Sequence, residues 1–155
     1  MIVYYPSPYL AQSECLRFED LLQSCGVLLR LENEQMMDAA TALSGSGPGY
    51  VFYFIEHALQ AANDLGFSKE QSELMVAQVI KGAVAQWRSS SEDPATLRRQ
   101  VTSKGGTTSA ALDFFEEAGI GKNLKRGIQC AFERARQLGG GLSLQVGAQS
   151  FKKTK

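Results

Sequence analysis

Two glycine- and hydroxyl-rich segments have the composition of ligand-binding loops. The first runs from Thr41 to Gly49 (TALSGSGPG) and the second from Gln100 to Thr108 (QVTSKGGTT). Each precedes a segment with helical periodicity, so each leads into the N-terminus of a helix. The first N–H groups of a helix lack acceptors within it, and the helix dipole favours negative charge there. Both segments are therefore candidate sites for a carboxylate or phosphate, although an ordinary capped turn has the same composition.

Other reactive side chains are few. The single histidine, His57, has no second metal-type residue near it in the sequence, so we interpret it as a solvated or hydrogen-bonded side chain, and we expect no metal site. Cys15, Cys25 and Cys130 have no CxxC spacing, which argues against a zinc finger or a redox pair. We expect Cys25 and Cys130 to be buried apolar residues. Chemistry here would depend on positioning, with the reactive group supplied by a cofactor.

Composition excludes several classes of protein. The chain has 155 residues, of which 44% are hydrophobic, which fits one folded domain. Acids and bases balance at 16 each, so we expect no nucleic-acid partner. The charges are unevenly distributed, because residues 98–155 carry 11 bases and 4 acids. This basic region is either an ordinary basic face or an anion-binding surface. No apolar run approaches the roughly 18 residues that span a bilayer, so we expect no membrane partner. An odd cysteine count without a signal peptide favours a cytoplasmic location.

The elements that must position the two segments are mostly helices. Before them, the pattern predicts a strand at 2–5, a helix at 12–24 and a strand at 27–31, although one such unit cannot cover its own sheet. The helix predicted at 70–87 is apolar on most sides, which indicates a central position or a subunit interface. Gly139, Gly140 and Gly141 are expected to end the last helix. The predicted helices are 34–43, 48–65, 70–87 with a capping box from Ser68 and Gln71, 94–101, 107–117 and 122–138.

Three stretches together resemble the C-terminal domain of pyrroline-5-carboxylate reductase. They are DAATALSGSGPGYVF (Asp38–Phe52), LRRQVTSKGGTTSAALDFFEEAG (Leu97–Gly119) and ERARQLG (Glu133–Gly139). The first is similar to the family's TALSGSGPAY element and the second to its VTSPGGTT signature. The resemblance covers roughly residues 15–138. Lys104 stands where the family usually has proline, and Gly49 where it usually has alanine.

The resemblance implies a mainly α fold, a helical bundle that interlocks as a dimer. Residues 1–31 would be a strand–helix–strand remnant of an α/β dinucleotide-binding (Rossmann) domain, of which nearly all is absent. Residues 32–138 would form the helical dimerisation and substrate-binding domain, and residues 139–155 a flexible tail. The expected partners are a second copy in a homodimer, in some members a higher ring, and a small anionic imino acid or proline.

The resemblance also implies a reaction and roles for particular residues. The family reduces 1-pyrroline-5-carboxylate to L-proline with NADPH or NADH. Thr108 would hydrogen-bond the ring nitrogen and help deliver a proton. The substrate carboxylate would be held by the Ser103 hydroxyl and by the N–H groups of Gly105, Gly106 and Thr107. The substrate and the nicotinamide would both be bordered by Gln100 and Val101, and the nicotinamide end of the pocket would be faced by Ser44 and Ser46.

Without a cofactor domain, we expect the chain alone to be inactive and to bind no cofactor tightly. One alternative is a non-enzymatic dimerisation or interaction module derived from the reductase, which would have no need of Ser103 and Thr108 together. A second is a β-hydroxyacid-type dehydrogenase, whose helical domain also follows a Rossmann domain. The two motifs argue against that second alternative.

Overall fold

The computed structural model describes the backbone of residues 1–146 and the side chains of residues 1–140. The chain forms two compact units. One contains Met1–Pro48 together with the chain from Lys125 onward, and the other contains Gly49–Leu124. The predicted domains, residues 1–31, 32–138 and 139–155, are not the same divisions as these compact units. Their boundaries therefore stay a prediction.

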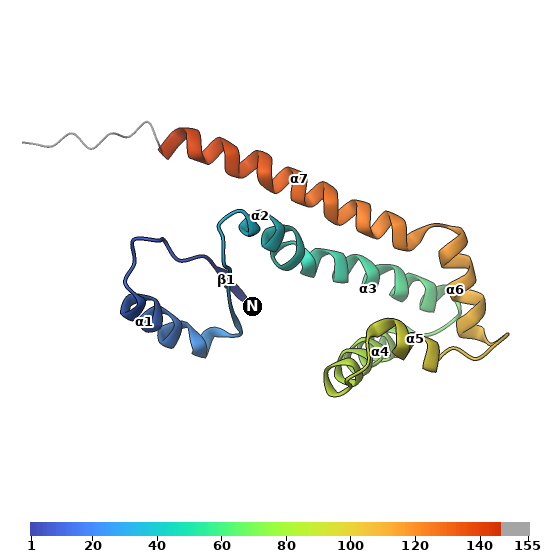
Figure 1. The fold of residues 1–155 in the computed structure, drawn as a ribbon. Helices are drawn as coiled ribbons and strands as arrows, with labels where there is room; N and C mark the ends of the chain where they lie inside the picture. Colours follow the sequence, from blue (N-terminus) through green and yellow to red (C-terminus); the bar gives the residue numbers. More distant parts are fainter. Residues whose placement is uncertain (147–155) are drawn as a thin grey trace, which may run out of the picture. The chain divides into compact units, whose positions relative to one another are not determined.

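The first unit begins with the predicted strand–helix–strand, drawn in blue in Figure 1. The strands pair in parallel, with Ile2 beside Leu28, which confirms the predicted topology. Gly26 has a φ of 143°, a region that favours glycine, where the chain turns into the second strand. The elements are β1 (Ile2–Tyr4), α1 (Gln12–Leu22), the 3₁₀ turn η1 (Gln23–Cys25) and β2 (Leu28–Arg30).

Polar and aromatic contacts tie both strands to α1. The Tyr4 hydroxyl donates a hydrogen bond to the Glu19 carboxylate, which also lies 3.9 Å from the Arg30 guanidinium. The hydrogen bond to Glu19 raises the pKa of Tyr4, because the phenol is held in its donating, neutral form. The ring of Tyr4 packs against Phe18 with centroids 5.2 Å apart. These contacts position α1 over the two strands.

The glycine-rich segment after β2 does not break the helix as predicted. Helix α2 (Met36–Ala40) continues directly into a π-helical turn, η2 (Thr41–Gly45), and α3 (Gly47–Asp64) follows after a single bend. The Ser46 N–H donates to the Thr41 carbonyl at 2.9 Å, which closes the wider turn. A π turn absorbs one extra residue while it keeps the backbone hydrogen-bonded, so the glycines do not have to end the helix.

The predicted end of the last helix at Leu138 is also wrong. Helix α7 runs from Ile120 to Val146 and passes through all three glycines. A glycine costs a helix only about 1 kcal/mol, and the close approach of α2 to α7 explains one of them. A Cβ on Gly139 would lie 3.3 Å from the Asp38 carboxylate. Of the tail predicted at 139–155, residues 147–155 lie outside the described residues.

In the second unit, local caps fix the helix boundaries as predicted. Gly66, with a φ of 93°, ends the turn after α3, and Ser68 forms a capping box with Gln71 at the start of α4 (Lys69–Ser89). The buried Ser72 hydroxyl donates to the Asn63 side chain at 3.2 Å and so joins α4 to the end of α3. The remaining helices are α5 (Pro94–Gln100) and α6 (Thr107–Glu117).

Asp93 gives the α5 cap a dependence on pH. Hydrogen bonds from the backbone N–H and the hydroxyl of Thr96 hold the pKa of this carboxyl below its usual value. A carboxyl group with a depressed pKa stabilises the folded chain at pH values above its pKa in the unfolded chain, which is near 4. That stabilisation is lost as the pH falls through the lower pKa of the folded chain. We expect Asp93→Asn to flatten the acid limb of thermal stability measured by circular dichroism, whereas Glu92→Gln beside it should not. An unchanged acid limb in Asp93→Asn would contradict this role.

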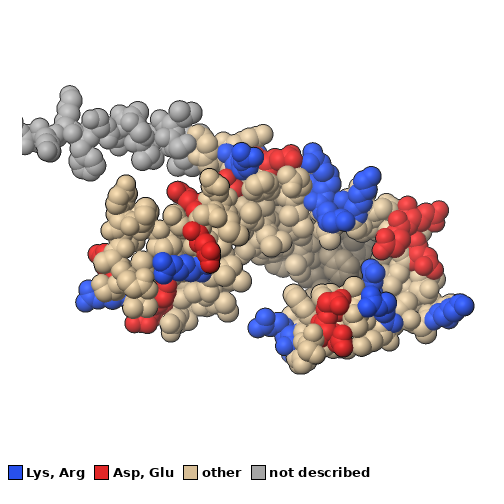
Figure 2. Space-filling view, in the orientation of Figure 1, with Lys and Arg blue, Asp and Glu red and all other residues tan. Residues whose placement is uncertain are grey.

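Little apolar surface is buried within the described residues. The buried apolar side chains there are Cys15, Leu31, Ala42 and Ala135. On α4, Leu74 is 63% exposed, Val79 68% and Trp87 51%. Figure 2 shows broad areas that carry no charged side chain, with charges in small groups. Exposed apolar surface of this extent is typical of surfaces that bind another polypeptide.

Candidate functional site

The segment after α5 forms a short loop held at its start by a threonine. The Thr102 hydroxyl donates to the Arg98 carbonyl at 2.6 Å, and the Thr102 N–H donates to the Arg99 carbonyl at 3.1 Å. These two bonds close the last turn of α5. The Arg98 guanidinium also lies 3.6 Å from the Glu116 carboxylate on α6. The two helices that flank the loop are thereby joined by an ion pair as well as by the chain.

Two adjacent glycines shape the loop for different reasons. Gly105 has a φ of 71°, which other residues rarely adopt. Gly106 has an extended conformation, but its N–H donates to the Ser103 carbonyl at 3.1 Å, and a Cβ there would overlap the Ser103 hydroxyl. The Ser103 hydroxyl therefore occupies the space beside the first turn of α6 that a side chain at Gly106 would fill.

The N-terminus of α6 has free hydrogen-bond donors. Its N-cap residue, Gly106, has no side chain to accept from them. Among the described residues, no acceptor takes the backbone N–H groups of Thr107, Thr108 and Ser109. Together with the Ser103 hydroxyl, these groups form a set of donors suited to a carboxylate. The Gly106 N–H, which the resemblance assigned to the carboxylate, is already used inside the loop.

The π-helical turn holds the other predicted residues. Ser44 lies within η2 and Ser46 directly after it, and both are half-buried. Their hydroxyls make no hydrogen bond within the described part of the chain. The Thr41 hydroxyl donates back to the Met37 carbonyl at 2.9 Å. π turns within α-helices occur frequently at functional sites, and this one presents two free hydroxyls.

The predicted site residues fall into two groups. Those from Gln100 to Thr108 lie in one loop with its flanking helix ends, in the second unit. Ser44 and Ser46 belong to the first unit. The structure brings the members of each group together.

The secondary candidates are partly confirmed. His57 is exposed, and its Nδ1–H donates to the Tyr53 carbonyl at 2.8 Å, in agreement with the predicted hydrogen-bonded or solvated side chain. The burial predicted for Cys25 and Cys130 is wrong, because both are exposed and only Cys15 is buried. Within the described chain, no cluster of His, Cys, Asp or Glu could hold a metal ion. No described helix is long and apolar enough to cross a membrane.

Comparison with known protein families identifies the helical region. Residues 34–138 match the family model described as pyrroline-5-carboxylate reductase dimerisation. The chain belongs to this family. The model covers η2, the loop from Ser103 to Thr108 and the exposed helix α4, so the resemblance of the two motifs extends over the whole region between them.

Curated relatives and solved structures of the reductase agree. Pyrroline-5-carboxylate reductase from Pseudomonas aeruginosa is 35% identical over 134 residues, which is 86% of this chain and 49% of the relative. The Aquifex aeolicus reductase is 36% identical over 83% of this chain and 48% of its own length. The crystal structure of Plasmodium falciparum pyrroline carboxylate reductase with NADP bound superposes with a TM-score of 0.84 at 31% identity and covers 88% of this chain and 55% of that one. The chain spans about half the length of the curated relatives it matches.

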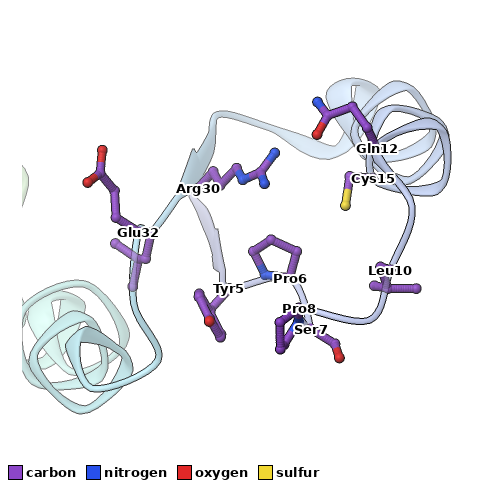
Figure 3. A pocket seen from close by; sticks show the side chains of 10 residues that line it. Tyr5, Pro6, Ser7, Pro8, Leu10, Gln12, Cys15, Arg30 and Glu32 are labelled. Carbon is purple, nitrogen blue, oxygen red and sulfur yellow. The ribbon is translucent and has the colours of Figure 1, made fainter.

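Two features of this reductase-family chain were missed from the sequence. The Thr102 hydroxyl that closes α5 could have been noticed, because a threonine at a helix end often bonds back to a carbonyl one turn earlier. The second is a cavity (Figure 3) lined by the segment after β1, which contains Pro6 and Pro8, and by residues after β2 and at the start of α1. Its only sequence signal is two prolines after a strand, which indicates a loop but not a cavity.

Proposed function

We propose that this chain is the dimerisation and substrate-binding half of a pyrroline-5-carboxylate reductase, which reduces 1-pyrroline-5-carboxylate to L-proline. The proposal is supported by family membership and by one structural observation. The start of α6 has free N–H groups at Thr107 and Thr108, and the Ser103 hydroxyl lies beside Gly106, the N-cap residue of that helix. The substrate and the product both carry a carboxylate, and a helix N-terminus stabilises such an anion.

Each loop residue then has a proposed role in binding. The Ser103 hydroxyl and the Thr107 N–H donate to the carboxylate, while Gly105 and Gly106 give the loop the shape that brings these donors together. Gln100 and Val101 border the substrate. The Thr108 hydroxyl hydrogen-bonds the ring nitrogen, and it is the group through which a proton reaches that nitrogen as the C=N bond is reduced.

The cofactor site is only partly provided by the described residues. The free hydroxyls of Ser44 and Ser46 fit the hydrogen-bonding edge of a nicotinamide carboxamide, and we propose that they face that end of the cofactor. NADPH or NADH, when bound, supplies the hydride. Hydride transfer needs donor and acceptor carbons about 3–3.5 Å apart, and the described residues supply only the nicotinamide end of a cofactor site. We therefore propose that the chain alone has no reductase turnover.

A homodimer is the proposed assembly, and the apolar surface of α4 is the observation that favours it. That same surface supports the second candidate, a dimerisation module without enzymatic function. The two candidates differ in ligand binding. A module needs neither the free donors of α6 nor the Ser103 hydroxyl. The predicted cytoplasmic location and the ring assembly stay predictions.

Titration calorimetry of the purified chain with L-proline, run beside a turnover assay with NADPH, tests the proposed function. We expect L-proline to bind without turnover, and Ser103→Ala to weaken its binding by roughly 3- to 10-fold through the lost hydrogen bond to an anion. Ser109→Ala is the matched control, because the Ser109 hydroxyl donates to Asp113 on its own helix. Absence of L-proline binding would leave the dimerisation module as the function. Turnover would show that the chain contains or recruits a cofactor site.

A further inference from the structure

The backbone identifies the type of turn that runs from Ser103 to Gly106. The Gly106 N–H donates to the Ser103 carbonyl, so Lys104 and Gly105 are the two central residues of a four-residue turn. Gly105 has a φ of 71°, and every described residue with a positive φ is a glycine. A negative φ followed by a positive φ defines a type II turn, in which proline is common at the first central position. Lys104 occupies that position, so the shape of the turn does not account for the lysine.

The charge of Lys104 has no ion-pair partner within the described chain. Its side chain is exposed and takes part in none of the ion pairs there. The two arginines at the end of α5 are both engaged. The Arg98 guanidinium lies 3.6 Å from the Glu116 carboxylate, and the Arg99 guanidinium donates to the Thr96 hydroxyl at 2.6 Å. Lys104 therefore carries the charge beside this loop that is free to act on a ligand.

The ammonium of Lys104 stays close to the proposed carboxylate donors. Lys104 directly follows Ser103 and lies three residues before Thr107. Consecutive Cα atoms are about 3.8 Å apart, and a lysine carries its charge on a flexible four-carbon stem. The distance from the ammonium to an anion on the Ser103 hydroxyl is thus comparable to the screening length, which is about 10 Å at 0.1 M salt. At this range, Lys104 attracts an anion even without direct contact.

The substrate and the product of the proposed reaction differ in net charge. 1-Pyrroline-5-carboxylate has a carboxylate and, above the pKa of its imine, a neutral ring nitrogen. Reduction adds a hydride to the imine carbon and a proton to the nitrogen, and the resulting basic amine takes a second proton from water. L-Proline is therefore a zwitterion with an ammonium next to its carboxylate. A nearby cation attracts the anionic substrate, but it attracts one end of the zwitterion and repels the other at almost the same distance.

We propose that Lys104 makes the carboxylate site selective for the anionic substrate over the zwitterionic product. This inference rests on the proposed function, because it assigns the carboxylate to the loop from Ser103 to Thr108. Lys104 is then a specificity-determining residue rather than a catalytic one, since it acts on the net charge of the ligand and touches no reacting atom. The same property favours release of the product, because reduction cancels the charge that Lys104 attracts.

The test compares L-proline with tetrahydrofuran-2-carboxylate, which has a ring oxygen in place of the nitrogen and therefore keeps the carboxylate but carries no ammonium. Both are titrated into the full chain by calorimetry. At about 0.01 M salt, Lys104→Gln should weaken binding of the anion by roughly 2- to 5-fold and that of L-proline by less than about 1.5-fold, as expected for an exposed charge several ångströms away. At about 1 M salt, where the screening length is about 3 Å, the loss should vanish.

Two further variants separate the charge of Lys104 from the shape of the turn. Lys104→Arg should keep the selectivity. Lys104→Pro, which suits a type II turn, should lose the selectivity as Lys104→Gln does. A role in the turn alone would instead change the affinity for both ligands by the same factor and would not depend on salt. The matched control is Lys122→Gln, which removes the same charge at the start of α7, beyond the far end of α6. The 11 residues of α6 span about 16 Å, so this variant should bind both ligands as the original chain does.

The outcomes distinguish this inference from the proposed function. An unchanged ratio of the two affinities in Lys104→Gln, a loss that persists at about 1 M salt, or an equal loss in Lys122→Gln would each overturn the role of Lys104. If both ligands bind and only the ratio fails to change, the proposed function stands without that role. If neither ligand binds the original chain, the proposed function fails and the inference fails with it.

Discussion

Gly106→Ala should strongly weaken the binding of L-proline to this chain. A Cβ at this position overlaps the Ser103 hydroxyl and lies 3.2 Å from the Ser103 carbonyl. That carbonyl also accepts the Gly106 N–H, so the methyl group must push away the residue that closes the turn. The proposed carboxylate donors would separate, and we expect binding to weaken by roughly 10- to 100-fold in titration calorimetry, the cost of lost hydrogen bonds to a charged ligand.

Gly121→Ala is the control for this substitution. Gly121 lies near the start of α7, where a Cβ has no neighbour within 4 Å. Alanine is the better helix former, so this variant should fold at least as stably as the original chain and bind L-proline as well. Undiminished binding in Gly106→Ala, with the circular dichroism spectrum of the original chain, would show that the carboxylate does not sit beside Ser103.

Elements with local caps could be predicted from the sequence to within one or two residues. Ser68 with Gln71 marks the start of α4, and Asp93 with Pro94 marks the start of α5. In each case the capping side chain bonds to a backbone N–H three residues later, so the information lies within one turn. The parallel pairing of β1 with β2 was likewise predictable, because a helix between two strands requires a crossover.

Elements determined by distant contacts were not predictable. Glycine composition indicated that α7 would end at Leu138, yet the helix passes Gly139 where Asp38 of α2 approaches it. The π turn at Thr41–Gly45 depends on where an extra residue is accommodated between two helices, which periodicity does not report. The sequence also predicted a buried Cys130, which is exposed in the single chain, because the type of a residue alone does not determine whether its position faces the core.

The candidate site was predictable in composition but not in its donor set. A serine, a threonine pair and two glycines before a helix indicated an anion site at residues 103–108. The sequence could not show that the Gly106 N–H is used by the Ser103 carbonyl, because that bond depends on the turn that Gly105 makes at positive φ. The distinction matters chemically. Gly106 acts through its missing side chain, whereas Ser103 and Thr107 offer the donors.

The exposed apolar side chains of α4 give the second large effect. Val79 lies near the middle of the helix with 68% of its surface exposed, and Leu74 and Val84 are 63% and 51% exposed. Little apolar surface is buried elsewhere, so folding of the single chain has a small hydrophobic driving force. In a dimer with twofold symmetry, each contact occurs twice, and so does each substitution. Dimerisation and folding are therefore expected to be lost together.

Val79→Glu should convert the dimer into a monomer of reduced helicity. Each copy loses the burial of a valine, about 1.5–3 kcal/mol, and would place a carboxylate in an apolar contact, so the dimer dissociation constant should rise at least about a thousandfold. Analytical ultracentrifugation should give twice the chain mass of 16.9 kDa for the original protein and the single mass for the variant. Ser91→Glu, which adds the same charge on the exposed turn before α5, should remain dimeric. A dimeric Val79→Glu would place the subunit interface away from this part of α4, and the exposed residues of α3, among them Phe52 and Phe54, would then be the surface that a second copy covers.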